Sequence, residues 1–79
     1  MNELPPKMRV CISSPPDREN LVAEIFYEGA QWAELNPEAS TGLTVEIYPR
    51  RHGQPWSFPL PDALAALQIA KRRLCGESD

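Results

Sequence analysis

Apolar and polar residues alternate with a period of two in several short stretches, and this pattern most constrains what the chain can fold into. In KMRVCIS (7–13) the apolar positions are Met8, Val10 and Ile12. In GLTVEIYPR (42–50) Leu43, Val45 and Ile47 alternate with a second set, Thr44, Glu46 and Tyr48. Successive side chains of a strand point to opposite faces, so both stretches are predicted to be half-buried strands.

Between them, VAEIFYEGAQWAEL (22–35) is typical of a β-hairpin, and its turn decides which side chains share a face. A three-residue loop over 27–29, with Gly29 in the left-handed position, would give a G1 bulge and pair odd residues with odd. A two-residue type II′ loop over 29–30 would pair odd with even. We favour the first, because the second buries a glutamate without an evident partner.

In the favoured register one hairpin face is apolar and the other is mixed. The apolar face holds Leu21, Ala23, Ile25, Ala33 and Leu35. The other face holds Val22, Glu24, Phe26, Trp32 and Glu34. The alternative register would instead place Trp32 and Glu34 on the core side with Ile25.

The last segment, PDALAALQIAKRRLCG (61–76), is predicted to be a helix over residues 61–75. Pro61 suits a first helical position, Asp62 and the basic run 71–73 suit the helix dipole, and Gly76 is a typical stop. One apolar stripe follows the 3.6-residue period, with Ile69 opposite it; the stripe consists of Ala63, Leu64, Leu67, Ala70 and Leu74.

These elements predict an α+β fold: an antiparallel β-meander of three to four strands with one C-terminal helix packed on one face. The helix is expected to pack its leucines on the apolar strand face, with Leu64, Leu67 and Leu74 against Val10, Ile25, Val45 and Ile47. SPPDREN (14–20), NPEASTG (36–42) and RRHGQP (50–55) are turn-rich connections, and WSFPL (56–60) fits a short edge strand. We expect a single small domain over residues 1–79, with a flexible lead-in (1–6) and tail (76–79).

No residue pattern indicates an enzyme or a cofactor. His52 is the only histidine, and it lies in a turn without a catalytic partner at an obvious spacing. Cys11 and Cys75 form no CxxC or Cys-His pattern, so we expect no metal and two free thiols in a reducing cytoplasm. GxSxG and GxGxxG patterns are absent from the sequence.

The net charge of −3 argues mildly against non-specific binding of nucleic acid. Two basic clusters keep nucleic acid open as an alternative partner: Arg50 with Arg51, and Lys71 to Arg73. The sequence has no apolar run of about 18 residues that would span a membrane, and the start of the chain lacks the apolar core of a signal peptide.

The run RVCISSPPDRENLVAEIFYEGAQWAEL, then TVEIYPR, then LPDALAALQIAKRRL, resembles small bacterial proteins with strands first and one helix last. In element order, over residues 7–75, it is similar to HicB-type antitoxin domains and to some toxin-immunity proteins. The resemblance implies a protein that acts by binding another protein.

One helix covers one sheet face, so the second face is expected to be open. We therefore predict a non-enzymatic cytoplasmic interaction module, either a homodimer or a partner binder, with Trp32 as the central contact. The predicted partner-binding residues are Glu24, Phe26, Trp32, Glu34, Glu46 and Tyr48.

Overall fold

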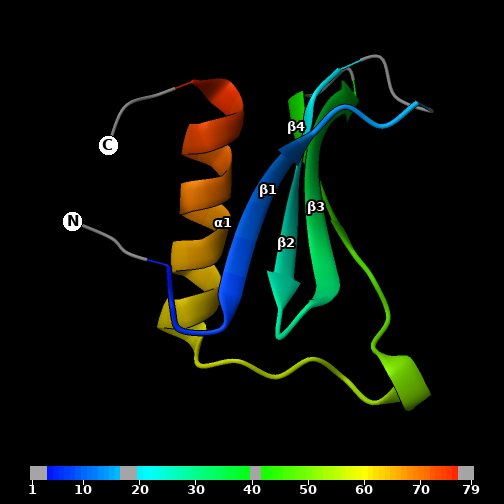
Figure 1. The fold of residues 1–79 in the computed structure, drawn as a ribbon, viewed down its shortest axis with the longest axis vertical. Helices are drawn as coiled ribbons and strands as arrows, with labels where there is room; N and C mark the ends of the chain where they lie inside the picture. The colour runs from blue at the N-terminus through cyan, green and yellow to red at the C-terminus, as the bar shows by residue number, and fades with distance from the viewer. Residues whose placement is uncertain (1–3, 17–19, 40–41, 77–79) are drawn as a thin grey trace.

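The computed structural model describes residues 4–16, 20–39 and 42–76 of the chain, and in these ranges it has the predicted α+β architecture. Four strands form one antiparallel sheet in the order β1-β2-β3-β4, and a single helix lies against one face (Figure 1). The strands are β1 (Met8–Ser13), β2 (Val22–Tyr27), β3 (Ala30–Ala39) and β4 (Gly42–Ile47). A short 3₁₀ turn, η1 (Arg51–Gly53), precedes the helix α1 (Leu60–Cys75).

The β2–β3 turn is neither of the two predicted turns. Tyr27 pairs with Ala30, which leaves a two-residue loop of Glu28 and Gly29. Both loop residues have positive φ, 51° and 85°, as a type I′ turn requires. This turn matches the right-handed twist of the flanking strands, which explains why the chain adopts it although Glu28 tolerates positive φ poorly.

A β-bulge then changes the register of the hairpin. Phe26 pairs with Gln31 but Ile25 pairs with Ala33, so Trp32 is an extra residue on β3. Beyond the bulge the pairing is odd with odd, and Ala23, Ile25, Ala33 and Leu35 share the helix face as predicted. The predicted parity is therefore confirmed, although the turn that was expected to produce it is wrong.

The core lies between α1 and the first three strands. Its buried members are Met8, Val10, Ala23, Ile25, Trp32, Ala33, Leu35, Ala66 and Ala70. Leu4, which the sequence placed in the lead-in, packs partly buried against this core. Pro5, Pro6 and Gly76 of the predicted lead-in and tail are described as well, whereas residues 1–3 and 77–79 lie outside the described residues.

The helix begins and ends almost where the sequence predicted, but it is rotated about its axis. Gly76 ends it in the left-handed conformation, with φ of 74°, and donates its N–H to the carbonyl of Arg72. The buried residues are Ala66, Ile69 and Ala70, whereas Leu64 is 51% exposed. The predicted stripe was wrong on Ile69 and Leu64. The small residues Ala66 and Ala70 face the sheet, while Leu67 and Leu74 pack partly buried at the side of the core.

The predicted edge strand WSFPL is not a strand. Its first residues form an extended segment that passes along one end of the sheet toward α1 (Figure 1). Phe58 contacts three aromatic rings there: Tyr27 at 5.1 Å, Trp32 at 4.9 Å and Trp56 at 5.8 Å between centroids. The Trp56 indole N–H also donates to the Tyr48 carbonyl at 3.0 Å. This segment therefore closes the lower end of the core with aromatic side chains.

Candidate docking surface

The predicted interaction face is the side of the sheet away from α1, and its glutamates do lie together there. Glu24 pairs with Glu34 across β2 and β3, and Glu34 pairs with Glu46 across β3 and β4. Like charges directly opposite each other destabilise a sheet, so this row needs compensation from its neighbours.

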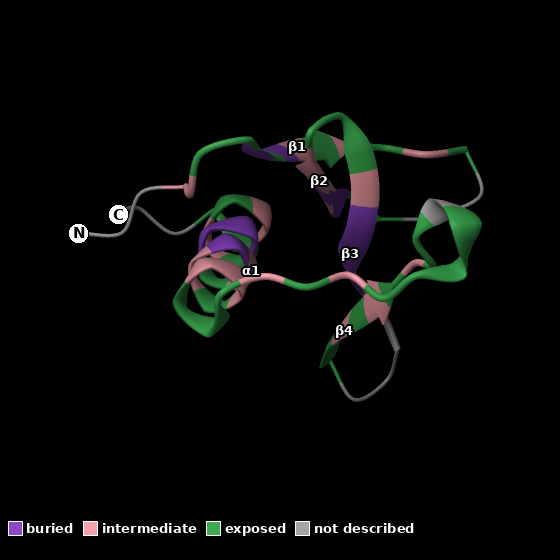
Figure 2. Ribbon diagram, turned by 90° about the horizontal axis from the view of Figure 1, so that it is seen from below, coloured by how far each residue is buried: buried purple, intermediate pink, exposed green. Residues whose placement is uncertain are grey.

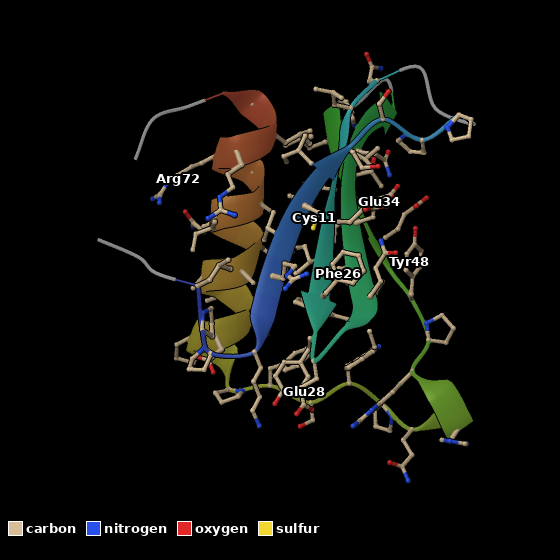
Figure 3. The ribbon with its side chains drawn as sticks, viewed as in Figure 1. Cys11, Phe26, Glu28, Glu34, Tyr48 and Arg72 are labelled. Atoms are coloured by element: carbon tan, nitrogen blue, oxygen red, sulfur yellow. The ribbon has the colours of Figure 1, made fainter. Side chains whose placement is uncertain are left out.

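Glu34, the middle member of the row, receives hydrogen bonds from two neighbouring side chains. The Tyr48 hydroxyl donates to one carboxylate oxygen of Glu34 at 3.2 Å, and the Asn36 amide donates to the other at 3.2 Å. Glu34 is 5% exposed and Asn36 is 2% exposed. Figure 3 shows Glu34 and Tyr48 on the side of the sheet away from the helix. Glu34 is thus a buried member of a hydrogen-bonded cluster, which leaves its carboxylate little access to a partner.

Trp32 does not lie on this face, which corrects the prediction that it sits beside Phe26 as the central contact. Its side chain is 4% exposed and belongs to the core cluster with Ile25 and Ala66. The bulge is the physical reason, because an extra residue re-aims the side chain at that position. The outer face keeps Glu24, Phe26, Glu46 and Tyr48, all half-buried.

A row of exposed apolar side chains lies instead on the helix side of β4. Leu43 is 39% exposed, Val45 45% and Ile47 58%. Figure 2 shows β4 set away from α1, with no buried residue along it. The predicted helix packing on Val45 and Ile47 is therefore wrong: among the described elements, α1 contacts β1, β2 and β3, but β4 contacts only β3.

The cause is one of size. An α-helix is about 10–12 Å wide and neighbouring strands lie about 4.8 Å apart, so one helix covers roughly two strands. The four-stranded sheet has room for a second helix over β3 and β4, and the described chain supplies none. The sequence predicted three to four strands and one helix, which indicates an incompletely covered sheet but not which strands stay uncovered.

A groove results between α1 and β4, which we call the α1–β4 groove. Its volume is about 400 Å³. The residues that line it are Leu35, Leu43, Thr44, Val45, Leu64, Leu67, Gln68 and Lys71. The surface is thus mainly apolar, with a glutamine and a lysine on the helix wall.

Other chemistry is sparse in the part of the chain that the structure describes. No three His, Cys, Asp or Glu side chains there are close enough to hold a metal ion. His52 is exposed in η1 with φ of 72°. Cys11 is half-buried on β1 and Cys75 is exposed at the end of α1, both as free thiols. No helix in the described ranges is long and apolar enough to cross a membrane.

The two basic clusters do not form one surface. Arg50 lies beside η1, with its guanidinium 5.1 Å from the centre of the Trp56 ring. Lys71, Arg72 and Arg73 lie in the last turns of α1, at the opposite end of the molecule (Figure 1). The side chain of Arg51 lies outside the described residues. A nucleic-acid backbone would therefore meet two separate groups of cations and not one continuous track.

Comparison of the chain with protein-family models, with curated proteins and with solved structures finds no match.

Proposed function

We propose that this chain is a non-enzymatic protein–protein interaction module that takes its partner into the α1–β4 groove. The observation that carries the proposal is the partly exposed apolar set on the two walls, Leu43 and Val45 on β4 and Leu64 on α1. A sheet with half of its helix layer absent presents a surface that another element could complete. An antitoxin or immunity protein, as the element order suggests, is one form that such a module takes.

The apolar side chains of the groove supply part of the free energy that binding a partner requires. Completely burying one Val, Leu or Ile side chain contributes about 1.5–3 kcal/mol. Leu43, Val45 and Leu64, each already about half covered, could thus contribute about 2–5 kcal/mol of gross transfer free energy. Association costs about 4–15 kcal/mol, so the affinity also depends on apolar surface that the partner buries and on polar contacts at the rim. Lys71 stands at that rim, which favours a partner element with an acidic residue beside its apolar stripe.

A matched pair of variants tests the proposal. Leu64→Lys places a charge on the groove wall, whereas Ile12→Lys places the same charge on β1, the other edge strand, where Ile12 is 40% exposed. Proteins that co-purify with the wild type are identified, purified and titrated by calorimetry against wild type and both variants. We expect Leu64→Lys to weaken binding at least tenfold and Ile12→Lys to leave it within threefold.

Equal binding by the two variants would contradict the groove as the docking surface. So would a wild type that binds no other protein at the highest concentration reached. Thermal melts of both variants show whether a loss of binding reflects a loss of folding.

A further inference from the structure

The free edge of β4 is a second unusual surface, distinct from the side chains that line the groove. Because β4 contacts only β3 among the described elements, the backbone groups on its other side have no strand beside them. The Tyr48 N–H donates to the Trp32 carbonyl at 2.9 Å, so this N–H points toward β3. The N–H and C=O groups of successive residues point to opposite edges of a strand. The open edge of β4 therefore carries the backbone groups of Leu43, Val45 and Ile47.

This edge lacks the features that usually prevent strands from pairing between molecules. Natural edge strands carry lysines, prolines, bulges or a covering element. The six residues of β4 include no lysine and no proline. Its pairing with β3 is regular from Thr44 to Ile47, since the irregularity lies between Asn36 and Ala39. The residues whose N–H and C=O groups point outward are apolar, so they carry no charge that would oppose pairing with another strand.

We propose that β4 pairs antiparallel with β4 of a second copy of this chain, centred on Val45. This register places Val45 opposite itself and Leu43 opposite Ile47 of the second copy. All three residues point their N–H and C=O groups outward, so each opposed pair exchanges both hydrogen bonds. On the helix side every opposed pair is then apolar, and on the outer side Thr44 faces Glu46 of the second copy.

The neighbouring registers are less favourable. Centring on Glu46 would set that carboxylate opposite its own copy, which destabilises a strand pair. Centring on Thr44 would leave Ile47 opposite a position before the start of β4, outside the strand. The Val45-centred register alone combines the full length of β4 with apolar pairs throughout the helix side.

The expected dimer is weak. A stable interface buries about 800 Å² on each partner, and pairing of one six-residue strand covers less. We therefore expect dissociation in the micromolar range or above, and a rapid monomer–dimer exchange. The inference and the proposed function both concern β4 but use different surfaces of it. The inference uses the backbone edge, and the proposed function uses the side chains that line the groove.

Single cysteines test the register directly. In a Cys11→Ser, Cys75→Ser background, Val45→Cys would stand opposite itself with Cα atoms about 5.5 Å apart, within disulfide range. Leu43→Cys, the matched control, would stand about 14 Å from its own copy, four residues along the strand, and cannot cross-link. Under mild oxidation at millimolar protein we expect Val45→Cys to become mostly covalent dimer, with Leu43→Cys below a tenth of that yield.

The double variant Leu43→Cys with Ile47→Cys should regain cross-linking, because those two positions face each other across the pair. Sedimentation of the unmodified wild type at the same concentration should show dimer. A monomeric wild type, or a dimer that Leu43→Cys captures as well as Val45→Cys, would overturn the inference. Neither result touches the groove, which is tested independently by the Leu64→Lys variant.

Discussion

Trp32 packs its indole against Phe58, with ring centroids 4.9 Å apart and planes tilted by 49°. This contact joins a bulged residue of the third strand to the segment that precedes the helix, and it closes the core at one end. Trp32, which the sequence pattern predicted to be a docking contact on the open sheet face, therefore serves to pack the core.

Trp32→Ala should cost about 3–5 kcal/mol of unfolding free energy, because it removes a buried aromatic side chain. Trp32→Phe should cost distinctly less, since the indole nitrogen has no hydrogen-bond partner among the described residues and phenylalanine keeps most of the ring contact. Urea denaturation of the two variants measures both costs. A Trp32→Ala variant as stable as the wild type would mean that the ring is not enclosed.

The rotation of the helix can be tested with one aliphatic residue on each side of it. Ile69 is 4% exposed and Leu64 is 51% exposed. Ile69→Ala should therefore cost about 2–5 kcal/mol, whereas Leu64→Ala should cost under about 1 kcal/mol. Thermal and chemical unfolding give both values. A larger cost for Leu64→Ala than for Ile69→Ala would contradict the burial of Ile69 and support the apolar stripe predicted from the sequence.

Glu28→Asn should stabilise the protein. Glu28 has φ of 51° in the type I′ turn, a conformation that costs most residues about 1–2 kcal/mol and that asparagine tolerates better. The change removes the ion pair between Glu28 and Lys7, but both side chains are more than half exposed, so that loss is under about 1 kcal/mol. We expect a net gain of several tenths of a kcal/mol in denaturant unfolding. Gly29→Ala, at φ of 85°, should act in the opposite direction.

The contribution of the buried Glu34 to folding stability should depend on its acceptor oxygens. Glu34→Ala would leave the Asn36 amide, 2% exposed, without the carboxylate to which it donates. We expect a cost of about 1–3 kcal/mol. Glu34→Gln keeps a carbonyl acceptor and should cost less, and Tyr48→Phe, which removes one donor, should cost about 1 kcal/mol. Unfolding curves of the three variants establish the order, and an equal cost for alanine and glutamine would contradict it.

Proline substitutions at two neighbouring positions of β4 test which edge each backbone N–H points to. Val45→Pro removes an N–H that points to the open edge, so the monomer should stay folded while self-association falls at least tenfold. Glu46→Pro removes an N–H that points to β3 and should cost about 3 kcal/mol or more. Circular dichroism and sedimentation separate the two effects. Unfolding by Val45→Pro would show that its N–H is used within the monomer.

The local features of the fold were set by local sequence. Period-two alternation marked the strands, and Gly76 marked the end of the helix. Glu24, Glu34 and Glu46 were expected on the same sheet face, and the strand pairing places them side by side there. These properties depend on backbone geometry and on neighbours in the chain, which a linear pattern records directly.

Only the tertiary structure decided which surfaces are open. The bulge at Trp32 turned one aromatic ring into the core, and the closest approach of Ala66 and Ala70 to the sheet rotated the helix so that Leu64 became exposed. The width of one helix left β4 uncovered. Bulges, helix rotation and layer coverage result from packing between elements distant in the sequence, and no local pattern encodes that balance.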